Sequence, residues 1–336
     1  MWMLDNQTPF EAERTWVRDK NGVHHWIVIV KATYDIDNNG TLSLSEEPME
    51  PLHAAEYIGD DGESSIRYEA DMVAMKPGTD IYLNAVAYAP NEKPCTELGV
   101  AFKINNFQKV LKVTGKRYWD GAFGGRIQRS DPEPFISMPI VYESAYGGFD
   151  QKDPNPSNHR IDFRNPIGSG FAYHPNNIIG TPAPNIEAMN QDLGKGNPAG
   201  FGAIAGFWSP RNQYAGTYDD NWTKTRKPLL PLDYDPRFLM CAPSDQQTQG
   251  YLAGGEQVEL VNLTPNNRMN FTLPKHSFQF ETYFGAQCKL HHSQLVSVVI
   301  ESEGPRLIMV WQTSLQVGND GDYLDKTVIT QTGSIQ

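Results

Sequence analysis

The glycine-rich run from Gly200 to Ala205 (GFGAIA) matches G-x-G-x-x-A, the pattern of dinucleotide-binding loops. Such a loop needs a strand before it and a helix after it, because the helix N-terminal amides bind the pyrophosphate. Here residues 194–198 (GKGNP) precede the run, and Trp208-Ser209-Pro210 would soon end any helix. The sequence therefore does not predict a bound cofactor.

Histidine, serine and acidic residues also occur in suggestive groups. The pairs His24-His25 and His291-His292 are adjacent, and neighbours on a strand point to opposite faces, so neither pair can hold one metal ion. Gly168-Ser169-Gly170 lacks the spacing of a nucleophile elbow. Residues 60–63 and 319–322 lack the alternating ligands of a calcium loop and read as solvated turns. We expect no catalytic residue and no metal site.

Arginines occur repeatedly near aromatic residues along the chain. Arg117 precedes Tyr118 and Trp119, and the stretch 208–222 (WSPRNQYAGTYDDNW) combines two tryptophans, two tyrosines and an arginine in turn-forming sequence. Contacts between guanidinium groups and aromatic rings stabilise folded loops and also build protein interfaces, so both roles stay open. We expect the tryptophans to be mainly buried and the polar run between them to face a partner. The candidate partner-binding residues are Arg117, Trp119, Trp208, Arg211, Tyr214, Tyr218, Trp222 and Arg226.

The composition is that of an acidic globular protein of 336 residues with a net charge of -12. This charge argues against nucleic acid and against an anionic membrane as partners. Cys95, Cys241 and Cys288 are isolated and odd in number, which predicts small buried side chains in a reducing compartment. The N-terminus has no secretory leader and no apolar run could span a bilayer, so we expect a cytoplasmic location.

Short apolar segments separated by turn residues fill both ends of the chain. This pattern predicts a mainly β protein with few short helices, whose framework is an antiparallel β-sandwich or is barrel-like and covers residues 8–145 and 256–317. The sequence Lys76-Pro77-Gly78 predicts a turn, and we expect an ion pair there that involves Asp71 or Asp80. The predicted strands are 25–36 with 42–44, 81–89, 98–104 with 110–113, 258–263 with 269–273, and 295–301 with 307–312.

The middle of the chain has a different character. Residues 151–250 hold 12 of the 24 prolines, and proline gives the backbone no amide hydrogen for long strands or helices. One helix is predicted from Asn185 to Leu193. Many aromatic side chains predict that residues 146–255, called the belt below, form an ordered loop around the framework. We expect a single domain over residues 1–336, with a polar, frayed tail over 318–336.

Motifs spread over roughly residues 8–312 resemble those of a bacterial family of type VI secretion effector adaptors, long filed as domain of unknown function 2169. Lys116 and Ala203 depart from it, since an acidic residue and a proline are expected there. The motifs include 30–34 (VKATY), 76–80 (KPGTD), 115–119 (GKRYW), 146–148 (YGG), 164–168 (RNPIG), 198–202 (PAGFG), 208–211 (WSPR), 215–219 (AGTYD) and 242–247 (APSDQQ).

The resemblance implies a cytoplasmic chaperone without catalytic residues. Such a protein binds an effector, usually one with a PAAR-like N-terminal domain, and loads it onto the VgrG-type spike protein. Two other classes stay open from the residues alone. One is a structural component of the secretion particle, and the other is a β-rich hydrolase or carbohydrate-active enzyme. The enzyme would need two of Asp219, Asp220, Asp233 and Asp235 placed about 5–10 Å apart across a cleft.

Overall fold

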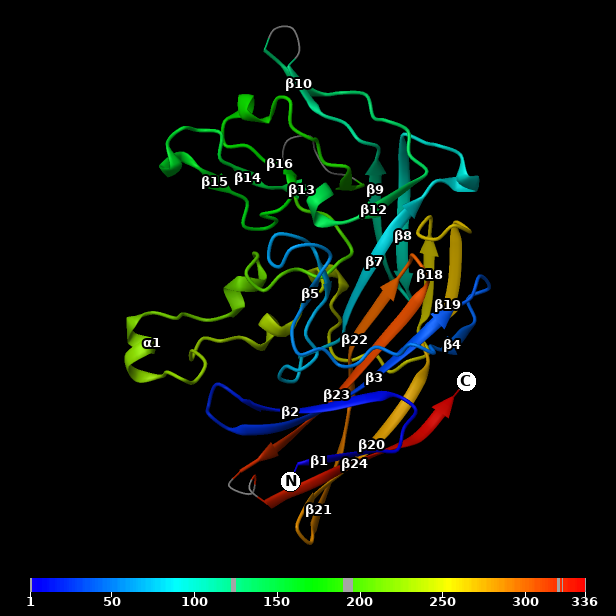
Figure 1. The fold of residues 1–336 in the computed structure, drawn as a ribbon, viewed down its shortest axis with the longest axis vertical. Helices are drawn as coiled ribbons and strands as arrows, with labels where there is room; N and C mark the ends of the chain where they lie inside the picture. The colour runs from blue at the N-terminus through cyan, green and yellow to red at the C-terminus, as the bar shows by residue number, and fades with distance from the viewer. Residues whose placement is uncertain (1, 122–124, 190–195, 319–320, 322, 336) are drawn as a thin grey trace.

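The computed structural model describes residues 2–121, 125–189, 196–318, 321 and 323–335. The largest of its sheets has seven strands, in the order β12-β7-β22-β23-β3-β2, with β4 beside the end of β3 (Figure 1). These strands are β2 (Glu11–Arg18), β3 (His24–Ile36), β4 (Leu42–Leu44), β7 (Asp80–Tyr88), β12 (Ser137–Ile140), β22 (Gln294–Glu301) and β23 (Arg306–Val317).

Two further sheets pack with it. The five-stranded sheet has the order β17-β9-β8-β18-β19, and the four-stranded sheet has the order β1-β24-β20-β21. The five strands are β8 (Glu97–Ile104), β9 (Phe107–Thr114), β17 (Ile186–Ala188), β18 (Gln257–Val261) and β19 (Arg268–Thr272). The four strands are β1 (Met3–Asn6), β20 (Lys275–Phe284), β21 (Gln287–His292) and β24 (Leu324–Ile335).

The remaining elements are short. Two-stranded ribbons are formed by β5 (Glu56–Tyr57) with β6 (Ile66–Tyr68), β10 (Trp119–Gly121) with β11 (Ile127–Arg129), β13 (Tyr146–Gly147) with β16 (Ser169–Gly170), and β14 (Phe149–Asp150) with β15 (Arg160–Ile161). The α-helix within the described ranges is α1 (Asp220–Thr225). Single 3-10 turns are η1 (Pro90–Glu92), η2 (Tyr142–Ser144), η3 (Pro156–Asn158), η4 (Pro175–Ile178), η5 (Arg211–Tyr214), η6 (Pro236–Leu239) and η7 (Ser244–Gln246).

The fold is mainly β, with 45% strand and 10% helix, which confirms the predicted class. Among the described residues no sheet closes into a barrel, so the framework is sandwich-like. The predicted strand pairs are present. For example, Leu98 to Ile104 and Val110 to Val113 lie in β8 and β9, which pair antiparallel across Asn105 and Asn106.

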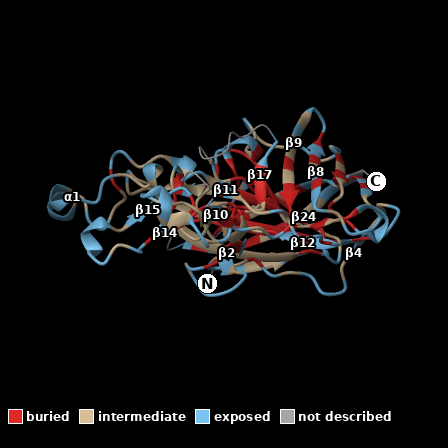
Figure 2. Cartoon of the chain, turned by 90° about the horizontal axis from the view of Figure 1, so that it is seen from above, coloured by how far each residue is buried: buried red, intermediate tan, exposed pale blue. Residues whose placement is uncertain are grey.

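The central strand β3 shows why a continuous apolar run is needed. Trp26, Val28 and Val30 point into the main core, which joins the three large sheets. Ile27 and Ile29 point to the opposite face, where they form a second cluster that residues 72–75 cover. A strand buried on both faces loses the usual alternation of apolar and polar residues. In Figure 2 the buried residues concentrate in the strands of the framework, whereas α1 lies exposed at one end.

Two predictions about local structure were wrong. Residues 186–188 of the expected helix form strand β17, paired with β9, and residues 190–193 lie outside the described part of the chain. Backbone pairing with an existing sheet edge outweighed a weak local helix signal. The tail is also not frayed: β24 lies between β1 and β20, and Leu324 and Ile329 are buried. Its inward-facing Thr327 made the strand look polar in the sequence.

The belt completes the seven-stranded sheet along one edge of β7. The strand β12 pairs only with residues 85–88 of that strand. Beyond this point the belt supplies the partners: Leu83 donates its amide hydrogen to the carbonyl of Phe201 at 3.0 Å, and the Gln246 amide group donates to the Ile81 carbonyl at 2.8 Å. The backbone groups of β7 are therefore satisfied by an irregular segment.

A buried ion pair fixes this junction. The carboxylate of Asp80, which is fully buried, accepts a hydrogen bond from Lys76 Nζ at 2.8 Å, so the ion pair predicted at this turn is present. The same carboxylate accepts the backbone amides of Cys241 and Ala242, each at 3.0 Å. Burial lowers the pKa of Lys76, but the charge of Asp80 outweighs it, and the net pKa is raised. Asp71, the other acidic residue considered there, instead pairs with Lys31 at 2.8 Å.

A chain of polar side chains crosses the core between the seven-stranded and four-stranded sheets. Trp26 donates its indole hydrogen to Thr327, and the hydroxyl of Thr327 contacts that of Thr282. His291 lies next in the chain, with Thr282 at one ring nitrogen and Thr313 at the other, each at 2.7 Å. Burial, and to a smaller extent the charge of His292, lowers the pKa of His291 to about 4.

This buried histidine predicts a loss of stability in mild acid. The unfolded chain binds a proton at His291 near the ordinary pKa of about 6.5, whereas the folded chain resists it until about pH 4. The stability that the protein gains from keeping His291 neutral is therefore complete above pH 6.5. It falls as the pH drops and is lower by about 2 kcal/mol at pH 5. Between pH 7.5 and pH 5, the free energy of unfolding measured in urea should fall by about 2 kcal/mol more in the wild type than in His291→Gln.

The neighbouring residue provides the control. His292 is exposed on the other face of the same strand, so His292→Gln should keep most of the pH dependence of the wild type. Equal pH dependence in the wild type and in His291→Gln would contradict the assignment.

Candidate functional site

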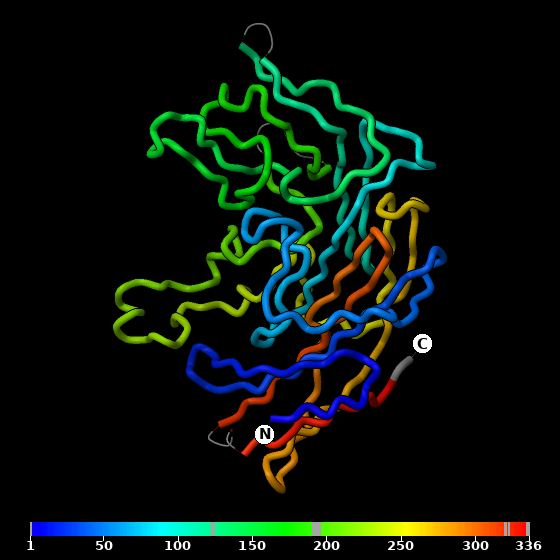
Figure 3. Tube along the Cα trace, in the orientation of Figure 1, coloured from blue at the N-terminus to red at the C-terminus, as the bar shows by residue number. Residues whose placement is uncertain are grey.

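Residues 209–238 project from the body of the protein as an arm, which carries α1 near its tip (Figure 3). The arm leaves and rejoins the body at η5 and η6, which pack together: the Asp235 amide donates to the carbonyl of Tyr214 at 3.0 Å. Six of the eight predicted partner-binding residues lie in the arm or at its base. They are Trp208, Arg211, Tyr214, Tyr218, Trp222 and Arg226.

Arg211 holds the base of the arm. Its buried guanidinium pairs with Glu69, donates from Nε to the carbonyl of Phe238 at 2.8 Å, and donates from Nη1 to the carbonyl of Ile204 at 2.7 Å. Burial opposes the charge of Arg211, but Glu69 more than compensates and the pKa is raised. Trp208, beside it in the fold, is buried as expected, with its ring edge-on to Tyr142. Arg211 and Trp208 are therefore structural residues of the base.

A second anchor lies midway along the arm. Arg226 donates to the carbonyl of Lys20 in the turn between β2 and β3, and to the carbonyl of Leu230 at 2.9 Å. Lys20 in return reaches the carbonyls of Leu232 and Tyr234, at 3.4 and 3.3 Å. The arm is thus tied to the framework at two places far apart in the sequence, and it projects as a supported element.

The tip is ordered by local contacts. The Asp219 carboxylate accepts the amide of Trp222 at 2.7 Å, which caps the first turn of α1. The Trp222 indole donates to the carbonyl of Leu229 at 2.8 Å, and its ring lies 4.7 Å from that of Tyr218. Trp222 is only half-buried, so the expected burial of the tryptophans applies to Trp208 more fully than to Trp222.

Three of the four carboxylates that an enzyme could use serve the structure of the arm, whereas Asp220 lies exposed in the first turn of α1. Besides Asp219 at the cap of α1, Asp233 accepts from the amide and hydroxyl of Thr217 at 3.0 and 2.7 Å. Asp235 pairs with Arg237 at 2.6 Å, and this contact lowers the pKa of the carboxyl group. Each of these three acids is engaged in holding a turn.

The other two predicted residues lie elsewhere. Arg117 and Trp119 belong to the region of the hairpin β10–β11, where Arg117 bonds to the buried Glu187 at 2.7 Å. Arg129 stacks on Trp119 with its guanidinium carbon 4.8 Å from the ring centroid. The eight predicted residues therefore form two groups, and the second group is completed by Arg129 and Glu187, which sequence reasoning did not select.

Exposed apolar side chains are the feature that the sequence reasoning missed. Of the sixteen large apolar side chains that are exposed in the described part of the chain, eight lie in the belt, although the belt has about a third of the residues. The leucines in residues 229–232 (LLPL) were the available signal, because apolar residues in a proline-rich loop need a contact. The eight are Phe149, Phe163, Tyr173, Ile179, Met189, Phe207, Tyr218 and Leu232.

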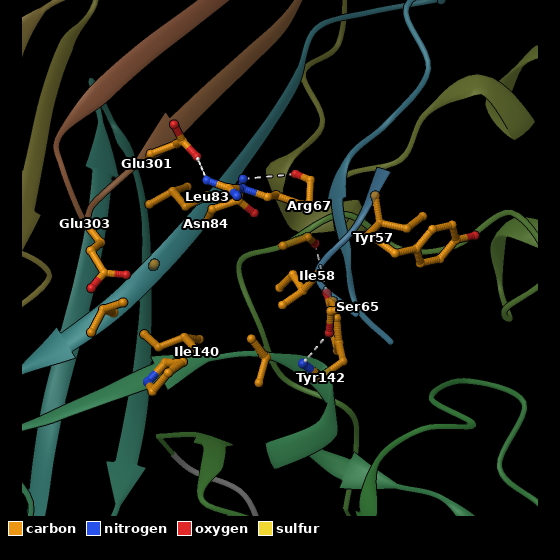
Figure 4. Close-up of a pocket in the computed structure, with 16 residues that line it drawn as sticks. Tyr57, Ile58, Ser65, Arg67, Leu83, Asn84, Ile140, Tyr142, Glu301 and Glu303 are labelled. Atoms are coloured by element: carbon orange, nitrogen blue, oxygen red, sulfur yellow. Dashed lines mark hydrogen bonds and ion pairs between the residues drawn. The ribbon is translucent and has the colours of Figure 1, made fainter. Parts of the chain in front are cut away.

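Figure 4 shows a pocket of about 310 Å³ where the ribbon β5–β6 meets β7 and β12. Its polar groups bind one another. Arg67 reaches Glu301 at 3.1 Å, and the Ser65 hydroxyl accepts the Tyr142 amide at 2.9 Å while donating to Glu143. These contacts hold the ribbon against β22 and η2.

The histidine pairs, the second acidic cluster and the cysteines do not form a site in the described part of the chain. His291 is buried and His292 exposed, as alternation on a strand requires, and no cluster of three metal-ligating side chains occurs among the described residues. Residues 319, 320 and 322 of the second acidic cluster lie outside them. The cysteines are free: Cys241 is buried, Cys95 is half-buried, and Cys288 is exposed because β21 is an edge strand, which corrects its expected burial. No helix within the described ranges could cross a membrane.

Replacing Arg211 should loosen the base of the arm. Arg211→Lys keeps the charge but loses the fork that reaches two carbonyls, so we expect a loss of about 2–3 kcal/mol in the free energy of unfolding. Trypsin should also cut faster after Lys224, which is exposed in the arm. Arg237→Lys is the matched control, because Arg237 also pairs with an acid and stacks on a ring but is exposed, and its replacement should change stability far less. Equal effects would contradict the anchoring role.

A family model described as an uncharacterized protein conserved in bacteria (DUF2169) matches residues 21–312. Searches of the curated proteins and of the solved structures gave no match. The matched range takes in the whole belt, including the arm, and most of the framework. The chain therefore belongs to the uncharacterized bacterial family DUF2169.

Proposed function

We propose that the protein is a cytoplasmic adaptor of type VI secretion. It binds an effector through the PAAR-like N-terminal domain of the effector and helps to load it onto the VgrG-type spike. The link to type VI secretion rests on the motif resemblance described above, and membership of a bacterial family is consistent with it. The proposal concerns binding, and it assigns no catalytic residue.

The observation that carries the proposal is the supported arm with exposed apolar side chains. Tyr218 is 53% exposed and Leu232 is 67% exposed, on a segment that Arg211 ties to Glu69 and Arg226 ties to Lys20. Water contact with such side chains is unfavourable by roughly 25 cal/mol per Å² of apolar surface, and a partner surface removes that cost. Aromatic and aliphatic side chains on a pre-organised element are also the usual anchors of protein interfaces.

The anchoring explains why this surface can act as an adaptor. A loop that must be ordered on binding loses part of its interaction energy as conformational entropy. Here Arg211 and Arg226 order the arm beforehand, so contact energy from Tyr218 and Leu232 becomes binding energy. A chaperone of this kind would cover an apolar face of its client until the spike replaces it.

Removing the exposed apolar groups should weaken capture of the client. We expect the wild type to co-purify with a PAAR-like effector encoded beside its gene, and Tyr218→Ser/Leu232→Ser to lose at least about tenfold in affinity, because each is a candidate anchor of an interface. Binding is measured by titration of the purified PAAR-like domain. Leu232→Ser alone tests the surface without disturbing the contact of Tyr218 with Trp222.

The framework offers a matched control. Tyr323 and Leu290 are 69% and 62% exposed and lie outside the belt, so Tyr323→Ser/Leu290→Ser removes the same side chains from another surface. Undiminished binding by the arm variant would contradict the role of the arm. Absence of binding to any PAAR-like effector by the wild type would contradict the adaptor function, and recovery of the protein in secreted particles would favour a structural component.

A further inference from the structure

A second site lies in the upper part of the body, away from the arm. A pocket of about 630 Å³ opens beside the hairpin β10–β11, and β16 and η4 form its opposite wall. Its apolar wall includes Ile127, Ala172, Pro175 and Ile178, and its polar wall includes Arg117 and Arg129. Figure 1 shows this region above the arm, at the end of the molecule where β10 lies.

The polar wall has more positive than negative charge. Glu187 accepts two hydrogen bonds from Arg129, at 2.8 and 2.9 Å, and one from Arg117 at 2.7 Å. Lys112 lies 3.9 Å from Glu187 and 3.8 Å from Glu97. Three cations thus share two carboxylates, which leaves one positive charge in excess within a protein of net charge -12.

The excess charge is placed where water screens it poorly. The side chains of Arg117 and Arg129 are 10% and 11% exposed. Burial, and to a smaller extent the neighbouring charge of Arg129, lowers the pKa of Arg117. A second anion at this wall would be attracted by both guanidinium groups.

Unused hydrogen-bond donors occur at the same wall. The Nε atoms of Arg117 and Arg129 and the indole nitrogen of Trp119 are buried and have no hydrogen-bond partner among the described residues. All three residues line the pocket. Buried donors are rarely left without a partner, because each costs about 1–3 kcal/mol. These three atoms are closed off from solvent, so they mark a desolvated wall, and a ligand in the pocket would meet other atoms of the same residues.

We propose that this pocket binds a carboxylate group carried by a small apolar body. Both Nη atoms of Arg129 and the Nη2 of Arg117 already bond to Glu187, which leaves Nη1 of Arg117 as the donor for a carboxylate oxygen, with the charge of Arg129 beside it. The apolar wall formed by Ile127, Pro175 and Ile178 suits an aliphatic or aromatic body better than a phosphate, which requires polar surroundings. The ligand is therefore either a free carboxylic acid or the C-terminal carboxylate of a peptide with an apolar last residue.

This proposal does not depend on the adaptor function. The carboxylate site uses Arg117, Arg129 and Trp119, whereas the adaptor surface uses the arm. Titration with small molecules tests the first, and capture of an effector tests the second. Either can fail without the other.

Calorimetric titration of the whole protein with hexanoate tests the site, with hexan-1-ol as the uncharged analogue. We expect hexanoate to bind with a dissociation constant on the order of 1 mM, and hexan-1-ol to bind at least about tenfold more weakly, since charged hydrogen bonds are lost. The peptide Ala-Ala-Leu is titrated as the free acid and as the amide. Tighter binding of the free acid than of hexanoate identifies a protein terminus as the source, and the reverse identifies a free acid.

Two variants and one control connect binding to this pocket. Arg129→Gln should weaken hexanoate binding by at least about tenfold. Because that change also disturbs Glu187, Ala172→Leu provides a second variant, which narrows the pocket from the apolar side and should weaken binding while leaving the cations in place. The control is Arg160→Gln, since Arg160 stacks on Tyr173 as Arg129 stacks on Trp119 but lies outside the pocket, and it should bind within about twofold of the wild type.

The outcomes separate a ligand site from an internal ion cluster. Equal binding of hexanoate and hexan-1-ol would overturn the proposal. So would the absence of binding by either at a concentration about ten times the expected dissociation constant. So would unchanged affinity in a folded Ala172→Leu protein together with unchanged affinity in Arg129→Gln. Loss in both variants, with none in the control, would support it.

Discussion

The ion pair between Lys76 and Asp80 is the contact on which the arrangement of the belt depends. Removing one partner would leave a buried charge, which usually costs about 3–5 kcal/mol, so the pair persists only because its hydrogen bonds are satisfied. Two of those bonds come from the backbone at 241 and 242, which is the segment that follows the arm. The pair therefore joins the start of β7 to the belt, and through the belt it sets where the arm leaves the body.

Much of the framework could be predicted from the sequence because its strands carry their own signals. The run 25–36 is apolar throughout and ends in an Asp-Asn-Asn-Gly turn, which defines both β3 and its hairpin with β4. The strands β2 and β24 were missed for the opposite reason. The edge strand β2 has charged residues along much of its length, and β24 places threonines where apolar residues are expected, so tertiary pairing rather than local pattern decides their structure.

The candidate site could be predicted only in part. The density of rings in 208–222 correctly marked an ordered loop, and the Arg117-Tyr118-Trp119 motif marked the second region. Glu69 pairs with Arg211, and Glu187 pairs with Arg117 and Arg129. The partners in each pair are far apart in the sequence. Long-range ion pairs have no sequence pattern of their own. The leucines of residues 229–232 indicate a contact, but the sequence does not show whether that contact is made inside the protein or, as the exposure of Leu232 allows, with a partner.

The position of β24 has a consequence for how the molecule is assembled during synthesis. It emerges from the ribosome after β1, β20 and β21, yet it lies between β1 and β20 in the finished sheet. Until it arrives, β1 has no partner in that sheet, and Phe280 and Phe284 of β20 lack their cross-strand neighbours Ile329 and Leu324. Closure of the four-stranded sheet is therefore a late event that joins segments more than 300 residues apart. A nascent chain stalled before β24 would present unpaired strand edges to other chains, which is the condition that favours aggregation.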